Sequence, residues 1–516
     1  MSERADLPNL DQLSPEEMKA LIVSQHKLIV SRDSEIEQLK LLIAKLRRMQ
    51  FGRSSEKLDR QIEQLELRLE ALQLNDGEMV RAMPEAIAEP VARAVRGPLP
   101  AHLPREVRTH LPKQKACPDC GGELRKLGED ASEVLERIPA QFQVIRHVRV
   151  KLTCTSCERI VQAAAPSRPI ERGMAGPGLL AHVLVSKFGD HLPLYRQSEI
   201  YAREGVPLDR ATLADWVGAS ARLLEPLGEM LRRHVMSAEK LHADDTPVPV
   251  LAPGLGKTKT GRLWTYVRDD RPAGDETPPA VWFAYTPDRK GEHPKAHLSD
   301  FRGLLQADAY AGFEQIYQAG NIREAACWAH VRRKFYDLHI AHKSPVAEEA
   351  LRRIGELYAI EADIRGRKPE ERHQVRSERS RSLLESLKQW LEETLGKLSR
   401  KSDTSLAVRY ALGRWEALMR YCDDGRLEID NNAAERALRA VALGRKNYLF
   451  AGSDRGGESA AVIYSLIGTA KLNGIDPESY LRNVLSRIAD HPINRIAELL
   501  PWNLSQEPSE DSSRAA

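Results

Sequence analysis

Residues 241–251 read LHADDTPVPVL, and the periodicity of the sequence changes here from helix to strand. Three further segments of strand character follow it: RLWTYV at 262–267, AVWFAY at 280–285 and GLLQAD at 303–308. Turns join the first three segments, and a short helix precedes the fourth. Three neighbouring strands, then a helix and another strand, predict a mixed α/β sheet.

Three acidic residues occupy positions that could bring them together. Asp244 stands on the first of these strands and Asp308 ends the fourth, so the two carboxylates emerge close together if the strands are parallel neighbours. Glu435 lies in the first turns of a later helix. Converging carboxylates suit Mg²⁺ or Mn²⁺. A pair of such ions can activate a water or a 3′-hydroxyl and stabilise the leaving oxygen of a phosphodiester.

Basic residues follow the third acid and could contact the phosphates of bound DNA. These candidate DNA-binding residues are Arg436, Arg439, Arg445 and Lys446. Asp245 is adjacent to Asp244, and the alternation of a strand places it on the opposite face, so the choice of Asp244 rather than Asp245 is a prediction about the pleat of this strand.

Four cysteines in two C-x-x-C pairs predict a structural zinc site. Cys117 and Cys120 precede a Gly pair, and Cys154 and Cys157 follow a segment with strand alternation. Four thiolates close a tetrahedral Zn²⁺ site and leave no position for water. The alternative is four free or redox-active thiols. Cys327, in a small and apolar context, is interpreted as a core cysteine on a buried strand; a nucleophilic pair with His330 is disfavoured, because no triad is recognisable around it.

The N-terminal residues 1–74 have the heptad spacing of a leucine-zipper-like coiled coil, with Ile22, Ile29, Ile36 and Ile43 seven residues apart. This pattern predicts a homo-oligomer, and the alternative is two amphipathic helices packed within one chain. Residues 75–112 are rich in Pro and predict a flexible linker, and residues 505–516 predict a disordered tail.

Two helical segments surround the predicted sheet in the sequence. Residues 169–236 are helical and suit a helix-turn-helix reader of DNA, although an ordinary helical hairpin has the same pattern. Residues 343–420 are helical and charged, and they interrupt the α/β unit between Asp308 and Glu435. Such an insertion could brace DNA or a second subunit, or it could have only a packing role.

The composition excludes several classes of protein. Lys and Arg number 77 and Asp and Glu number 74, so the formal net charge of +3 excludes a simple polycation. No run approaches 18 apolar residues, which argues against a membrane span, and the N-terminus lacks the pattern of a secretory signal. Six cysteines in 516 residues are too few for a disulfide scaffold. We therefore expect a cytoplasmic, nucleoid-associated protein with no membrane partner.

Several long motifs resemble those of the insertion-sequence-66 family of bacterial DDE transposases. They are 242–251, 257–264, 308–313, CWAHVRRKF at 327–335, DNNAAER at 430–436 and RKNYLFAGS at 445–453. The resemblance implies an RNase H-like fold, a catalytic triad of Asp244, Asp308 and Glu435, and Mg²⁺-dependent strand cleavage and transfer. It also implies accessory proteins encoded by the same element.

These inferences give an α/β multidomain protein with seven expected segments. They are a coiled coil at 1–74, a linker at 75–112, a four-cysteine zinc-binding domain at 113–168, a helical segment at 169–236, a catalytic domain at 237–460 with its insertion at about 343–420, a helical cap at 461–504 and a tail at 505–516. We expect a transposase that binds the ends of its element and transfers strands by in-line phosphoryl transfer. The alternatives are a zinc-containing DNA-binding protein without chemistry and a nuclease without strand transfer.

Overall fold

The computed structural model describes residues 99, 101 and 103–504, apart from residues 113–115, 139–140, 253, 255–256, 309 and 319. The expected coiled coil at 1–74 and tail at 505–516 lie outside the described residues.

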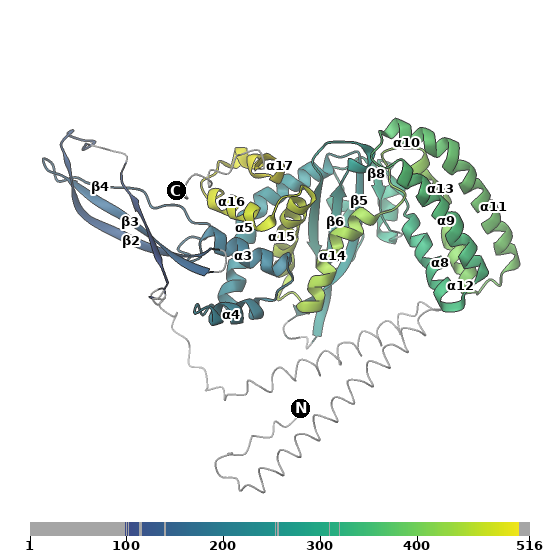
Figure 1. Cartoon of the computed structure of the whole chain (residues 1–516), viewed down its shortest axis with the longest axis horizontal. Helices are drawn as coiled ribbons and strands as arrows, with labels where there is room; N and C mark the ends of the chain where they lie inside the picture. The colour runs from purple at the N-terminus through teal and green to yellow at the C-terminus, as the bar shows by residue number, and fades with distance from the viewer. Residues whose placement is uncertain are drawn as a thin grey trace, which may run out of the picture. The chain divides into compact units, whose positions relative to one another are not determined.

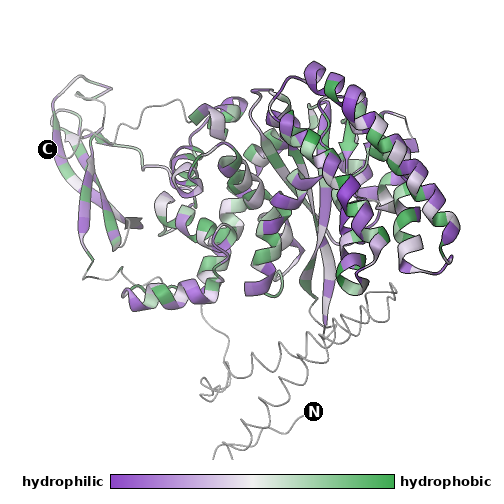
Figure 2. Ribbon diagram, turned by 45° about the vertical axis from the view of Figure 1, so that its right-hand side comes forward, coloured by the Kyte–Doolittle hydropathy of each residue, from purple (hydrophilic) through white to green (hydrophobic). Residues whose placement is uncertain are grey.

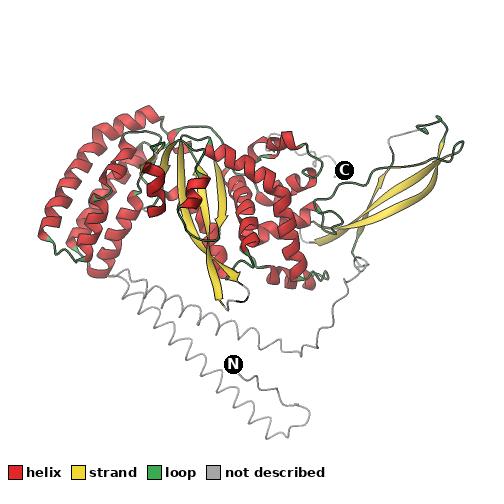
Figure 3. Ribbon diagram, turned by 180° about the vertical axis from the view of Figure 1, so that it is seen from behind, coloured by secondary structure: helices red, strands yellow, loops and turns green. Residues whose placement is uncertain are grey.

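A five-stranded mixed sheet forms the centre of the expected catalytic domain (Figure 3). Its order is β7-β6-β5-β8-β9. The strands are β5 (Lys240–Ala252), β6 (Lys257–Arg268), β7 (Ala280–Thr286), β8 (Gly303–Gln306) and β9 (Ile322–Ala325). The first three pair antiparallel, whereas β8 runs parallel to both β5 and β9. The four strands expected from the sequence are therefore present, and β5 and β8 are parallel neighbours as the position of the two Asp residues required.

The two faces of this sheet are covered by different helices. On one face, Phe283 of β7 packs against Tyr464 of α15 (Asp454–Leu472), with ring centroids 5.7 Å apart. On the other face, Trp264 and Tyr266 of β6 contact His297 at the end of α6 (Glu292–His297). Alternate residues of each strand thus pack on opposite faces of the sheet. A shift of one residue in the strand pairing would move every side chain to the wrong face, so this packing fixes the register.

A separate sheet contains the C-x-x-C pairs. Its strands are β1 (Arg105–His110), β2 (Leu124–Ile138), β3 (Gln141–Cys154) and β4 (Ile160–Gln162). Both β2 and β4 pair antiparallel with β3, and β1 pairs parallel with it. The expected linker at 75–112 therefore contains a strand. Its apolar residue Val107 is 56% exposed, so main-chain pairing with β3 rather than side-chain burial holds β1 in place, and composition carried no signal for it.

The segment 169–236 is helical, as the sequence predicts. It forms α3 (Pro177–Phe188), α4 (Leu194–Arg203) and α5 (Arg210–Met236). The long α5 packs against β7 and α15, and its buried residues include Leu213 and Leu224. One face of α5 is thus buried in the core. The DNA-binding helix-turn-helix role of this segment stays a prediction.

The insertion is a helical bundle that follows β9. It contains α8 (Trp328–His342), α9 (Pro345–Asp363), α10 (Pro369–Val375), a π-helical turn (Arg376–Ser380), α11 (Arg381–Lys397), α12 (Asp403–Leu412) and α13 (Trp415–Met419). Cys327 lies in the connection between β9 and α8. The expectation of a buried strand at Cys327 is wrong: the strand ends at Ala325, although the cysteine itself is buried as expected. Its small and apolar neighbours are equally suited to a buried helix start.

The chain then returns to the sheet through α14 (Asn432–Asn447), which packs against β5 and β6 (Figure 1). After α15 come α16 (Pro477–Arg487), the 3₁₀ helix Ile493–Leu499 and α17 (Pro501–Leu504). The expected boundary at 460/461 falls inside α15, which packs against β7. Helices around the sheet mix hydrophilic and hydrophobic residues along their length (Figure 2), as amphipathic helices with one packed side do. No helix in the described part of the chain is long and apolar enough to span a membrane.

A buried ion pair organises the insertion, and breaking it should destabilise the protein. The Arg376 guanidinium is fully buried and donates two hydrogen bonds to the Glu361 carboxylate, at 2.8 and 2.6 Å. It also donates to the carbonyl oxygens of Tyr421 and Leu427. Replacement by Met leaves a buried carboxylate short of its partner, so Arg376→Met should lower the free energy of unfolding by about 3–5 kcal/mol.

Chemical denaturation measures this loss, and Arg352→Met is the matched control. Arg352 pairs with Glu349 and Glu356 on the exposed surface of α9, where an ion pair contributes about 0–1 kcal/mol. Equal losses in the two variants would show that burial does not strengthen the Arg376 pair.

Candidate active site and zinc site

Asp244 lies in the middle of β5 on the side of the sheet that α14 covers. It is paired across the sheet with Thr265 of β6, whose side chain is fully buried. One oxygen of the Asp244 carboxylate accepts a hydrogen bond from the backbone N–H of Asp245 at 2.7 Å. The carboxylate also lines a pocket against α14. It is therefore fixed in orientation and accessible from one side.

Asp308 lies two residues beyond the end of β8, the parallel neighbour of the strand that carries Asp244. Its Oδ1 accepts a hydrogen bond from the backbone N–H of Tyr310, and its Oδ2 lies 3.8 Å from the Arg289 guanidinium. The negative charge of Asp308 is close enough to raise the pKa of Asp244. The two parallel strands thus bring the two Asp residues near each other electrostatically.

Glu435 lies in the first turn of α14, whose start is held against the strand ends by the buried Asn431. The Asn431 side chain donates to the carbonyl oxygen of Ala243 at 2.9 Å and contacts His242 Nδ1 at 3.1 Å. Burial lowers the pKa of His242 to about 3, so this histidine is a neutral structural partner. On β8, the Gln306 side-chain amide donates a hydrogen bond to the carbonyl oxygen of Glu428. Its Oε1 accepts a hydrogen bond from the backbone N–H of Glu428. The position of Glu435 therefore depends on β5 and β8 together.

Asp244 and Glu435 both line a pocket of ≈ 620 Å³, and basic side chains border it. Arg436 and Arg439 of α14 line it, together with Arg333 and His330 of α8. Asp308 does not line this pocket. The structure therefore places Asp244, Glu435 and two of the predicted DNA-binding arginines around one opening, with Asp308 beside it.

Asp245 also borders this pocket, but its carboxylate is buried between two arginines. Its carboxylate is 1% exposed and lies 3.1 Å from Arg262 and 2.7 Å from Arg289. The Arg289 guanidinium also stacks on the Tyr310 ring at 4.1 Å. Asp245 therefore holds Arg289 beside Asp308. No sequence pattern pointed to Arg289, because it lies in a loop far from the motifs of Asp245 and Asp308.

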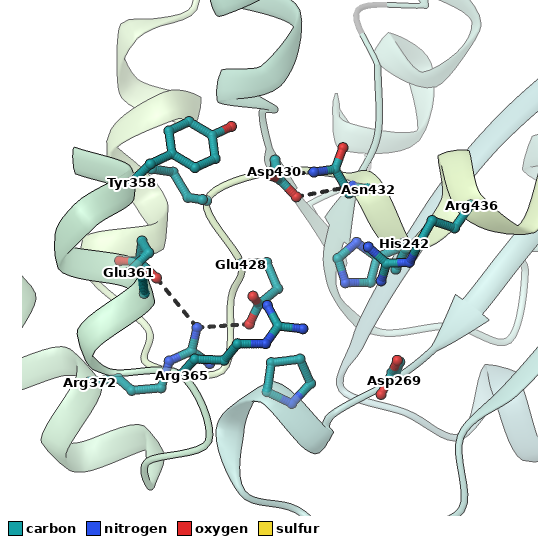
Figure 4. A pocket seen from close by; sticks show the side chains of 14 residues that line it. His242, Asp269, Tyr358, Glu361, Arg365, Arg372, Glu428, Asp430, Asn432 and Arg436 are labelled. Atoms are coloured by element: carbon teal, nitrogen blue, oxygen red, sulfur yellow. Dashed lines mark hydrogen bonds and ion pairs between the residues drawn. The ribbon is translucent and has the colours of Figure 1, made fainter. Parts of the chain in front are cut away.

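A second pocket, of ≈ 220 Å³, joins the sheet to the insertion (Figure 4). In it, Arg372 lies between Glu361 and Glu428 and is paired with both. Arg365 and Arg436 also line this pocket, and neither forms an ion pair with another described residue. Arg436 lines both this pocket and the pocket that contains Asp244. Its positive charge is therefore available to a ligand in either pocket.

The remaining predicted DNA-binding residues lie at the end of α14. The Arg445 guanidinium donates to the carbonyl oxygen of Pro247, so it ties α14 to β5. Burial lowers the pKa of Arg445. Lys446 is exposed. These two residues therefore differ in environment from Arg436 and Arg439, which are exposed at the pocket.

Asp244, Asp308 and Glu435 affect one another through their charges, but their carboxylate oxygens do not gather within 4.8 Å of one another among the described residues. Burial, together with the weaker repulsion from Asp308, Asp245 and Glu435, raises the pKa of Asp244 to about 7. Carboxylate oxygens are the hard ligands that Mg²⁺ and Mn²⁺ prefer, and a divalent cation between these acids would relieve their repulsion.

This repulsion predicts that Asp244→Asn stabilises the metal-free protein. A raised carboxylate pKa means that ionisation opposes folding: the penalty is absent near pH 4, grows between about pH 4 and pH 7, and is complete above pH 7. At pH 8 the metal-free variant should be more stable than the wild type by roughly 1–3 kcal/mol, and the difference should shrink towards pH 5. Thermal unfolding in a chelator at several pH values measures it. The exposed Asp215→Asn is the control, and a pH-independent difference would contradict the expected linkage.

The four cysteines of the C-x-x-C pairs meet at one point. Their Sγ atoms all lie within 4.8 Å of one another, with 3.3 Å between Cys117 and Cys157 and 3.4 Å between Cys120 and Cys154. Cys117 and Cys120 precede β2, Cys154 ends β3, and Cys157 lies in the turn that leads to β4. Two tight turns on neighbouring strands therefore supply all four sulfurs.

The surroundings of the sulfurs fit Zn²⁺. Backbone N–H groups of Cys157 and Ser156 lower the pKa of Cys154 to about 6, which favours the thiolate that binds metal, whereas the neighbouring cysteine sulfurs raise the pKa of Cys120 and Cys157. A Cβ atom on Gly122 would lie 2.9 Å from Cys154 Sγ, so only glycine lets the first turn approach the cluster. The set of four cysteines therefore suggests a closed, structural zinc site.

Comparison with protein families identifies the chain. A family model described as "Transposase IS66 family" matches residues 172–459, over half of the chain. The chain belongs to the IS66 family of transposases. Three further models of this family match: "zinc-finger binding domain of transposase IS66" at 114–158, "IS66 C-terminal element" at 465–502, and "Transposase C of IS166 homeodomain" at 38–108. The IS66 zinc-finger match spans all four clustered cysteines.

Relatives resemble the chain along most of its length. It is 45% identical to "Uncharacterized protein y4hP" of Sinorhizobium fredii, over 90% of this chain and 88% of the relative. It is 39% identical to "Uncharacterized protein y4qI" of the same species, over 92% of this chain and 90% of the relative. The resemblance to IS66 transposases stated from the motifs is confirmed.

Proposed function

We propose that this IS66-family chain binds the ends of its insertion sequence and catalyses metal-dependent DNA cleavage and strand transfer on an RNase H-like domain. The observation that carries the proposal is the pocket in which Asp244 and Glu435, from a strand and a helix far apart in sequence, open between arginines. The mixed sheet that supports Asp244 and Asp308 agrees with it.

Asp244, Asp308 and Glu435 are the residues that would hold Mg²⁺ or Mn²⁺. When bound, such ions activate the attacking water or 3′-hydroxyl and stabilise the leaving oxygen. Gln306 and Asn431 keep the three carboxylates in place by joining the start of α14 to β5 and β8. Asp245 keeps Arg289 beside Asp308, where its charge would meet a phosphate or the metal-bound carboxylate.

The DNA backbone would enter over the cations at the pocket rim. Arg436 and Arg439 are exposed there, and Arg333 joins them. Lys446 extends this basic surface along α14, and Arg445 stabilises the helix end through Pro247. Contacts of this kind position the duplex without reading its sequence. End recognition is assigned to the four-cysteine module and helices α3–α5, and self-association to the leucine-zipper-like region.

A strand-transfer assay tests the proposal. It uses full-length protein, labelled DNA from the ends of the element, a target plasmid and Mg²⁺, with and without the accessory proteins of the same element. Joined product that requires Mg²⁺ and the terminal sequence is the expected result. Binding without cleavage in every mixture would instead favour a DNA-binding protein without chemistry. Cleavage without joining would favour a nuclease.

A further inference from the structure

A second group of metal-ligand side chains lies beside Glu435. Cys327 is in the connection between β9 and α8, His330 is in the first turn of α8, and Glu435 is in the first turn of α14. One ligand atom from each of the three residues lies within 4.8 Å of the other two. Three separate backbone positions thus direct a sulfur, a nitrogen and an oxygen to one point.

His330 has an unused nitrogen at this point. Its Nδ1 is buried and has no hydrogen-bond partner among the described residues, while its Nε2 lies 3.8 Å from Glu435 Oε1. Buried polar atoms are nearly always paired, so the unpaired Nδ1 shows that hydrogen bonds within the described residues do not account for this imidazole, whose Nε2 faces Glu435.

The side chain of Cys327 is fixed close to His330 and Glu435. It is 5% exposed, and its Sγ accepts a hydrogen bond from the backbone N–H of Asn431 at 3.1 Å. Burial raises the pKa of this thiol to about 12, so it stays protonated while no cation is present. A metal ion would replace that proton, which leaves to solvent.

The donor set selects the class of metal. Mg²⁺ prefers oxygen ligands, whereas a thiolate and an imidazole favour borderline-soft ions such as Zn²⁺. Three protein ligands leave a fourth position for water, unlike the closed four-cysteine cluster near Cys117.

We propose that Cys327, His330 and Glu435 bind a Zn²⁺-class ion at a site separate from the four-cysteine module. Occupancy ties the Glu435 carboxylate to α8 and withdraws it from the Mg²⁺ site that it shares with Asp244. Zinc at this site is therefore an inhibitor of the reaction. This consequence rests on the proposed function; the binding of zinc does not.

Zinc content tests the site without reference to activity. Full-length protein is equilibrated with Zn²⁺, freed of excess ion and measured by elemental mass spectrometry. We expect Cys327→Ser and His330→Asn each to hold one zinc ion per chain fewer than the wild type. Cys422→Ser changes a buried cysteine that lies in no ligand cluster of the described residues and should hold as much as the wild type. Circular dichroism confirms folding, and two independent ligand variants guard against one that misfolds. Equal zinc content in the wild type and both ligand variants would overturn the site.

Zinc inhibition tests the consequence. Mg²⁺-dependent cleavage is measured at increasing Zn²⁺, and each variant is compared with its own zinc-free rate. The wild type and Cys422→Ser should be inhibited at zinc concentrations at which Cys327→Ser keeps its rate. Equal inhibition of wild type and Cys327→Ser would overturn the regulatory role. If the wild type never cleaves but still holds the additional zinc, the proposed function fails and the site stands.

Discussion

Glu435→Gln, in the full-length protein with Mg²⁺, should reduce cleavage of element ends by about 10³-fold or more while leaving DNA binding intact. A metal ion stabilises the charge of the transition state by several kcal/mol, and each 1.36 kcal/mol is a factor of ten in rate. The amide keeps the size of the side chain but is a weaker metal ligand. Asp244→Asn and Asp308→Asn should have effects of the same order, because we propose that the three carboxylates hold the metal ions together.

Single-turnover cleavage and a binding titration at fixed salt separate the two properties. Glu416→Gln is the matched control, since Glu416 is exposed on α13 away from the pocket. A Glu435→Gln protein that cleaves at the wild-type rate would remove Glu435 from the active site. Equal loss of DNA binding would show that Glu435 supports the fold rather than the chemistry.

Much of the site could be predicted because its residues belong to regular elements. Asp244 lies on a strand with clear periodicity, and Glu435 begins a helix whose start and basic character are visible in sequence. Strand alternation was enough to place Asp245 on the other face from Asp244, where Arg262 and Arg289 meet it. The sequence predicted that Asp244 and Asp308 approach each other only if their strands are parallel neighbours, and β5 and β8 meet this condition.

The residues that sequence reasoning missed are those whose roles depend on contacts between distant segments. Arg289 lies in a loop, and only the fold brings it to Asp308. His330 and Cys327 are three residues apart, a common spacing on a helix, and nothing in that spacing shows that Glu435 approaches them. Similarly, β1 has little apolar character, so its pairing with β3 is a tertiary effect that local patterns do not report.

Cys154→Ser should release zinc and unfold the module formed by β1–β4, because metal binding supplies much of the stability of such small sites. Structural Zn²⁺ in zinc-finger peptides contributes an apparent free energy of about 10–16 kcal/mol at pH 7. Cys154 is fully buried at the end of β3, and its Sγ accepts from the Ser156 N–H. A hydroxyl in its place is a poor zinc ligand, so the two turns lose the ion that joins them.

Elemental analysis and limited proteolysis measure the outcome. The wild type should lose resistance to cleavage within residues 116–162 when a strong chelator is added, and Cys154→Ser should lack it from the start. Cys422→Ser, a buried cysteine far from these turns in sequence, should keep both zinc and resistance. The sheet around β5 has its own strand pairing and lies far in sequence from the four cysteines, so its protection should persist in Cys154→Ser. A Cys154→Ser protein with full zinc content would mean that the four sulfurs do not form the metal site, and the closeness of the two turns would then need another cause.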